Sequence, residues 1–160
     1  MALALVLLAA LVVGVFIFTL GQTLPPLVAS HFGAAGQANA FMPRSAFVGI
    51  MLFVGCFVPV LIWLLTSVAA RKGIARIPNA AHWLSPANRV QTFAFLQNAT
   101  AAFAIALAGF IGFVFWLVVI ANRSAPPILR FWPFVAALGS FIAFTVGWVA
   151  NLALRFRRPP

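Results

Sequence analysis

Four long runs of apolar residues dominate the sequence, and shorter stretches between them collect the basic, proline and asparagine residues. The runs cover residues 1–21, 45–70, 99–121 and 131–154. An α-helix rises about 1.5 Å per residue, so roughly 20 apolar residues suffice to cross the hydrocarbon core of a bilayer. The pattern therefore predicts an all-α fold, an integral membrane four-helix bundle that forms a single domain over residues 1–160.

Local signals refine where these helices bend and begin. Pro59 lies inside the second run and cannot donate a hydrogen bond to the carbonyl of Gly55, which predicts a kink there. Ser85 followed by Pro86 is typical of a helix start, so the third helix is expected to begin near residue 86 and to extend beyond its span. The first run lacks the basic leader of a signal peptide, which indicates a retained span.

Small residues recur at intervals of four in the last two runs. In lipid, such rows allow two helix backbones to approach closely. Because the loop between these runs is short, we expect the third and fourth helices to pack as an antiparallel pair along the two rows. The alternative interpretation is that the spacing arises by chance, because the sequence is rich in alanine and glycine. The rows are Ala104, Ala108 and Gly112 in the third run, and Gly139, Ala143 and Gly147 in the fourth.

The composition supports a membrane location, and the distribution of basic residues predicts how the chain is oriented in the membrane. Hydrophobic residues make up 65% of the chain and charged residues 6%, against about 25% charged residues in a soluble domain. The ten basic residues flank the apolar runs, which indicates membrane topology and contact with lipid headgroups rather than nucleic acid. Seven lie in the 71–98 segment and the tail, and three lie in the other two loops, so both termini of this multi-pass protein are expected in the cytoplasm.

The sequence offers little for catalysis. It contains no Asp and no Glu, which excludes paired-carboxylate hydrolysis and leaves a serine–histidine pair without its acid. The apolar runs carry no ionisable side chain other than the lone Cys56, which argues against an ion or proton pathway. His31 and His82 are expected on opposite sides of the membrane and cannot share a metal ion. We therefore predict no enzyme activity, no metal and no cofactor of its own, with contact to lipids or to the cofactors of a partner left open.

Two loop segments carry a family resemblance. The first has a proline pair, a His-Phe pair, a glycine turn and a closing arginine; the second has a Pro-Asn turn and a tryptophan before another proline. Together they resemble a small bacterial multispan membrane-protein family of unknown function that is related to the N-terminal domain of Sdp-type toxin-immunity proteins. Asn39 and Ala81 depart from that pattern, because such sequences often carry an acid there. The motif positions in the two segments are Pro25, Pro26, His31, Phe32, Gly36, Asn39 and Arg44, then Pro78, Asn79, Trp83 and Pro86. The resemblance implies a multi-pass protein of the bacterial cytoplasmic (inner) membrane.

Three functions follow as hypotheses. The first is a non-catalytic accessory or structural subunit of a larger bacterial membrane complex, packed against a larger integral membrane protein and against lipids. The second, implied by the resemblance, is a stand-alone toxin-immunity or signalling protein that works through the loop from His31 to Arg44. The third is a small transporter, which the missing charge in the spans makes the weakest of the three.

Overall fold

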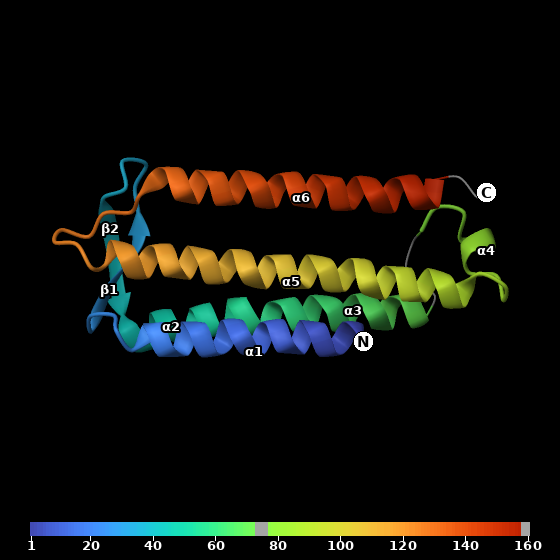
Figure 1. Cartoon of the computed structure of the whole chain (residues 1–160), viewed down its shortest axis with the longest axis horizontal. Coiled ribbons are helices and arrows are strands. Elements are labelled where there is room, and N and C mark those ends of the chain that lie inside the picture. Colours follow the sequence, from blue (N-terminus) through green and yellow to red (C-terminus); the bar gives the residue numbers. More distant parts are fainter. Residues whose placement is uncertain (73–76, 158–160) are drawn as a thin grey trace.

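The chain forms four long helical rods that lie side by side, with a small β-hairpin across one end (Figure 1). The computed structural model describes residues 1–72 and 77–157. Four helical segments in it are long and apolar enough to cross a membrane. The start of α1 and the end of α6 both lie at the end of the bundle opposite the hairpin (Figure 1). The four rods are α1 (Ala2–Gly21), the continuous segment Arg44–Arg71, α5 (Arg89–Ala121) and α6 (Phe131–Arg157).

The second rod is built from three consecutive pieces. They are α2 (Arg44–Leu52), a π-helical turn η1 (Phe53–Phe57) and α3 (Val58–Arg71). Pro59 stands at the start of α3 and has no N–H for the carbonyl four residues earlier. A wider π turn accommodates this break in the hydrogen-bond ladder. The irregularity expected near Gly55 and Pro59 is therefore present, and it takes the form of a π turn.

The fold is not purely α-helical, because residues 22–44, expected as a loop, contain two strands. Strand β1 (Leu27–Phe32) pairs antiparallel with β2 (Ala38–Pro43), and the register runs from Leu27 opposite Pro43 to Phe32 opposite Ala38. The strands are short and interrupted by two bulges on either side of His31. Because bulges disturb the alternation of apolar and polar positions, the period-2 pattern of a strand is weak in this segment.

The third helix begins three residues later than its start signal suggested. Pro86 lies in a turn in which the Ser85 carbonyl accepts hydrogen bonds from the N–H groups of Asn88 and Arg89. Helix α5 then runs without interruption over 33 residues. A single helical turn, α4 (Ala80–Trp83), precedes it in the connector. The predicted extension of this helix beyond its apolar span is therefore present, with a corrected start.

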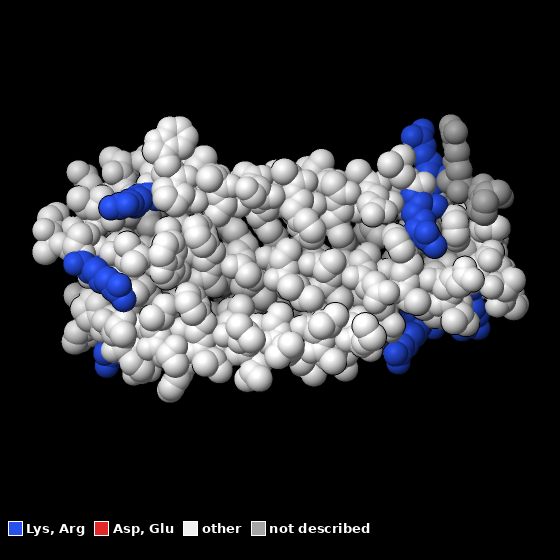
Figure 2. Space-filling model, in the orientation of Figure 1, with Lys and Arg blue, Asp and Glu red and all other residues white. Residues whose placement is uncertain are grey.

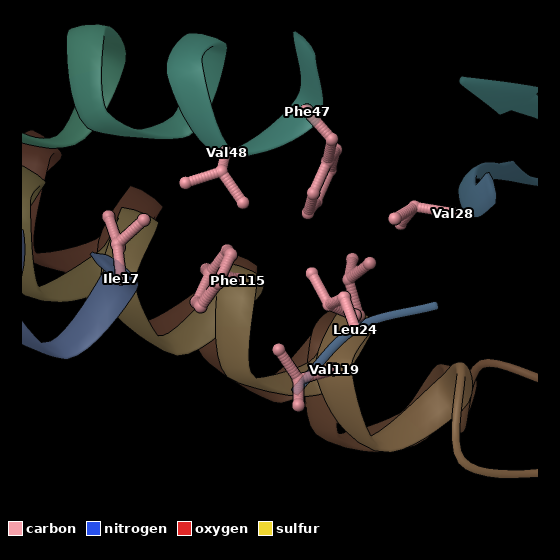
Figure 3. Packing of buried hydrophobic residues seen from close by; sticks show 8 residues of the cluster. Ile17, Leu24, Val28, Phe47, Val48, Phe115 and Val119 are labelled. Atoms are coloured by element: carbon pink, nitrogen blue, oxygen red, sulfur yellow. The ribbon is translucent and has the colours of Figure 1, made fainter. Parts of the chain in front are cut away.

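Helix α5 is the centre of the molecule. One side of it packs on α1 and on the second rod, while α6 contacts mainly α5 (Figure 1). The largest apolar cluster lies at the hairpin end, where side chains from α1, β1, α2 and α5 converge around Phe115 (Figure 3). A second cluster near the other end joins Val6, Trp63 and Ala104. The apolar window of α6 has no buried residue, against 44% in α5, so α6 is the least covered rod.

Candidate functional site

The hairpin end of the bundle carries the first set of motif residues, and Asn122 holds the hairpin there. The backbone N–H of Ala29 donates to the Asn122 side-chain oxygen at 2.8 Å, and the amide nitrogen of Asn122 donates to the Ala29 carbonyl at 3.0 Å. Ala29 is fully buried in β1, and Asn122 is the C-terminal cap of α5. An amide side chain can satisfy both backbone groups at once because it carries a donor and an acceptor. Sequence reasoning missed Asn122, whose only signal was a polar residue directly after an apolar run.

Replacing Asn122 with alanine is expected to loosen the hairpin without unfolding the bundle. Three side-chain hydrogen bonds are lost, two with Ala29 and one with the Val118 carbonyl, and a buried backbone pair is left unsatisfied, which costs about 2 kcal/mol. Hydrogen–deuterium exchange of the Ala29 amide should accelerate, while exchange in the middle of α5 stays unchanged. The control is Asn98→Ala, because Asn98 is an exposed asparagine of α5 that lines a groove between α5 and α6. Unchanged exchange at Ala29 would show that this side chain does not hold the strand.

Arg44 closes the base of the hairpin. One of its Nη atoms donates to the carbonyl of Gln22 at 3.3 Å and to that of Leu24 at 3.1 Å, and its backbone N–H donates to Pro26 at 2.9 Å. Gln22 caps the C-terminus of α1, where helix carbonyls lack partners and the dipole favours a cation. The closing arginine of the motif and Pro26 therefore meet in the structure, and their contact joins α1 to α2.

The hairpin turn is fixed by Gly36. This residue has φ +80°, the left-handed region that glycine adopts without a Cβ penalty. Its N–H donates to the Gly33 carbonyl at 2.8 Å, and its own carbonyl accepts the N–H of Leu129 at 2.8 Å. Gln37 pairs with Ile128 in a single bridge beside this contact. The turn is thus attached to the loop between α5 and α6.

The remaining residues of the first motif lie on the hairpin surface. His31 is exposed, and its Nδ1 lies 3.2 Å from the hydroxyl of Ser30. Together with Phe32 it borders a groove of about 230 Å³ above α5. Asn39 is exposed on β2, and Pro25 leads the chain from α1 into β1. These side chains form a surface rather than a cluster that converges on one point.

The second motif lies at the opposite end and ties the connector to α6. Asn79 adopts φ +54°, and its amide nitrogen donates to the carbonyls of Phe156 and Arg157, each at 3.0 Å. These carbonyls belong to the last turn of α6, which otherwise lacks partners for them. The Trp83 ring meets the buried Phe156 edge-on, with centroids 5.6 Å apart. Asn79 and Trp83 therefore act together as a cap.

Next to this cap, aromatic rings contact the side chain of Arg155. The Arg155 guanidinium lies 4.2 Å from the Phe95 ring centroid and 5.7 Å from that of Trp83. Such cation–π contacts stabilise an arginine that has no acid nearby. Pro78 and Pro86 are exposed in the turns on either side of α4. The motif as a whole fastens two segments of the chain and encloses no cavity among the described residues.

The two rows of small residues do not face each other, contrary to the expectation. Ala104 and Ala108 are buried, and a Cβ on Gly112 would contact Val13, so the row on α5 packs towards α1 and the second rod. Gly139 and Gly147 have no described atom within 4 Å of the position of an added Cβ. Gly139 and the exposed Ala143 therefore lie on the outer surface of α6, while Gly147 borders the groove between α6 and α5 without close contact.

Helices α5 and α6 nevertheless form the expected antiparallel pair through bulky side chains. The Phe110 and Phe141 rings stack with centroids 4.8 Å apart, and the Phe103 centroid lies 6.0 Å from that of Phe141. The Trp148 indole N–H donates to the Ala99 carbonyl at 2.7 Å. Aromatic contacts thus replace the small-residue contact that the spacing suggested.

The described histidine, arginine and lysine side chains are confined to the two ends of the molecule, while the Cys56 thiol lies in the π-helical turn η1. Figure 2 shows basic side chains at both ends and a middle band without them. His31 in β1 and His82 in α4 lie at opposite ends (Figure 1). Among the described residues no three His, Cys, Asp or Glu side chains are close enough to hold a metal ion. Arg44, Arg123 and Arg130 lie at the hairpin end, and Arg71, Lys72, Arg89, Arg155 and Arg157 at the other, while Arg76 and Arg158 are outside the described residues.

The site thus consists of a hairpin anchored on one end, a cap on the other end and an open face along α6. Comparison with models of protein families, with curated proteins and with solved structures returned no match to this chain.

Proposed function

We propose that this chain is a multi-pass protein of the bacterial cytoplasmic membrane, with both termini in the cytoplasm. The support is the middle band without basic side chains, bounded by arginine-bearing ends (Figure 2). Seven of the ten basic residues belong to the connector and tail, and positive residues are enriched in cytoplasmic loops. A reporter enzyme active only outside the cytoplasm, fused within the hairpin turn, should be active there and silent at the C-terminus.

Within that membrane, we propose that the chain is a non-catalytic accessory subunit of a larger complex. The observation that carries this proposal is the open row of small residues on α6. Gly139, Ala143 and Gly147 are all exposed on a helix whose other side contacts α5, and Gly147 lies at the edge of the groove between the two helices. Association of helices in lipid depends on close van der Waals packing, and small residues permit it. A helix of a larger integral membrane protein is the partner that fits this face.

The composition of the chain agrees with a structural role. The sequence holds no side-chain carboxylate that could act as an acid, a base or an ion ligand. Its polar contacts are used to fasten backbone segments, as Arg44, Asn79 and Asn122 do. A subunit that stabilises a neighbour needs such internal rigidity and an open packing face, and it needs no reacting group.

Bulky substitution on the α6 row is expected to release the partner. The variant Gly139→Leu/Gly147→Leu should reduce co-purification with the partner about tenfold, which corresponds to a loss of about 1.4 kcal/mol of packing. Quantitative mass spectrometry of an affinity-purified tagged chain, solubilised in a mild detergent, measures the ratio. The free chain should keep its thermal stability, because no described atom lies within 4 Å of a Cβ added at either glycine.

Gly109→Leu is the matched control for this experiment. Gly109 also has nothing within 4 Å of an added Cβ, but it lies on the opposite helix α5. Equal loss of partner in the control would contradict the assignment of the interface to α6. Recovery of the wild-type chain without any stoichiometric partner would overturn the accessory role itself.

The second candidate is a toxin-immunity or signalling protein that works through the hairpin. The observation that favours it is the rigid attachment of the hairpin by Arg44 and Asn122, combined with exposed Leu27, His31 and Phe41 on its surface. A surface that recognises a secreted protein benefits from such a fixed geometry. The variant His31→Ala/Phe41→Ala should then abolish protection against the toxin and leave co-purification with any α6 partner intact.

A further inference from the structure

A groove at the hairpin end, between the last turns of α5 and the start of α6, combines two features that no other part of the described chain combines. Its mouth carries two arginines, and its floor is apolar. The volume is about 470 Å³. The residues that define it are Trp116, Ile120, Arg123, Ile128, Arg130 and Pro133.

The walls of this groove are fixed in place. The Ser124 hydroxyl donates to the Ala121 carbonyl at 2.8 Å and accepts the N–H of Ile128 at 3.2 Å, which closes the loop on itself. The hairpin holds the same loop from the other side through the hydrogen bond between Leu129 and Gly36. A ligand therefore meets a preformed site and loses little free energy in ordering it.

The charges at the mouth lack a counter-charge. Arg44 is occupied by two carbonyls and Arg155 by two aromatic rings, whereas the guanidinium groups of Arg123 and Arg130 are exposed and make no hydrogen bond to a described residue. The sequence has no Asp or Glu to pair with them. Arg130 also directly precedes α6, where the positive end of the helix dipole adds to its own charge. An anion with several acceptor oxygens would relieve this concentration of positive charge.

The floor of the groove identifies which anion fits. Trp116 and Ile128 are 40% and 47% exposed, and they add apolar surface to the groove that the two arginines also line. A free phosphate would leave that surface uncovered, while a lipid acyl chain would cover it. Indole and arginine side chains both favour the headgroup level of a bilayer.

We propose that this groove binds an anionic phospholipid, with the headgroup phosphate between Arg123 and Arg130 and an acyl chain along Trp116 and Ile128. The proposal rests on the membrane location proposed above and is independent of the accessory role. A lipid held here would connect α5 to α6, which otherwise meet through aromatic contacts nearer the middle of the bundle.

Native mass spectrometry of the purified full chain, solubilised in a mild nonionic detergent, tests the proposal. Dioleoylphosphatidylglycerol is titrated against dioleoylphosphatidylcholine, and inorganic phosphate is added as a competitor. The wild type should bind one phosphatidylglycerol in preference to phosphatidylcholine, and millimolar phosphate should not displace it. The variant Arg123→Gln/Arg130→Gln should bind phosphatidylglycerol on the order of tenfold more weakly. If the double variant does not fold, the single variants carry the test, each with a several-fold loss.

Arg71→Gln/Lys72→Gln is the matched control, because it removes the same charge from exposed positions at the other end. Equal weakening in this control would show that only the net charge matters and would overturn the site. Equal binding of phosphatidylcholine, or displacement by phosphate, would overturn the assignment to an anionic lipid. Resistance of the chain to carbonate extraction from membranes reports on membrane insertion separately, so a failure of the lipid site does not imply a failure of the membrane location.

Discussion

Replacing Phe115 with alanine is expected to cause one of the largest losses of stability in this chain, about 3 kcal/mol. The Phe115 ring is fully buried on α5 and stacks on Phe47 with centroids 5.9 Å apart (Figure 3). It also meets Phe16 edge-on, with centroids 6.4 Å apart. In the proposed lipid environment the transfer of the ring out of the protein costs little. The loss therefore comes from the cavity and from the missing contacts. The free energy of unfolding, measured by titration with sodium dodecyl sulfate in mixed micelles, checks the value.

Phe144→Ala provides the control for this measurement. Phe144 lies on α6 with 39% of its surface exposed, so its removal deletes the same atoms without opening an internal cavity. We expect a change below about 1 kcal/mol in the control. Equal losses for the two variants would mean that the cluster around Phe115 does not stabilise the junction of α1, α2, β1 and α5.

The four long apolar helices were predictable from the sequence because length and hydropathy are sufficient to define them. The run at 131–154 became α6 over Phe131–Arg157, and the run at 1–21 became α1 over Ala2–Gly21. Pro59 likewise predicted the irregular turn in the second rod, since a missing N–H removes one backbone hydrogen bond in any helix. These features depend on local chemistry and need no knowledge of the tertiary neighbours.

The hairpin and the direction of the small-residue rows were not predictable in the same way. Spacing by four places Ala104 and Gly112 on one face of α5, but it does not say which neighbour that face meets. Helix α5 has three other rods as possible neighbours for each of its faces. On the side of α6, the bulky Phe103, Phe110 and Trp148 lie between the two helices and exclude a close contact between glycines. The hairpin depends on Asn122, a residue 93 positions from its partner in the sequence.

In the candidate site, too, some residues were known from the sequence, while the contacts that they make appear only in the structure. The positions Arg44, Gly36 and Asn79 were singled out only through the family resemblance, which does not say what contacts they make. Their partners could not be identified, since backbone carbonyls carry no sequence signal. The groove that contains Arg123 and Arg130 could not be predicted from the sequence either, because it forms only when the hydrogen bond between Ser124 and Ile128 folds the loop back.

Substitution of Gly36 by valine is expected to detach the hairpin turn from the loop between α5 and α6. A Cβ at this position would overlap the Leu129 carbonyl oxygen, and φ +80° is unfavourable for a β-branched residue. The loop must then move away, which breaks the 2.8 Å hydrogen bond between the Leu129 N–H and the Gly36 carbonyl. Strain and the lost contact together cost about 3 kcal/mol. Titration with sodium dodecyl sulfate measures the loss, and faster exchange of the Leu129 amide locates it.

Gly33→Val separates this effect from a general weakening of the turn. An added Cβ at Gly33 lies 3.9 Å from its nearest neighbours, which is ordinary van der Waals contact, and its φ is not in the left-handed region. The control should therefore retain most of its stability and the slow exchange of Leu129. If Gly36→Val leaves the Leu129 amide as protected as in the wild type, the turn does not hold the loop. In that case the hairpin would be attached to the bundle by Arg44 and Asn122 alone.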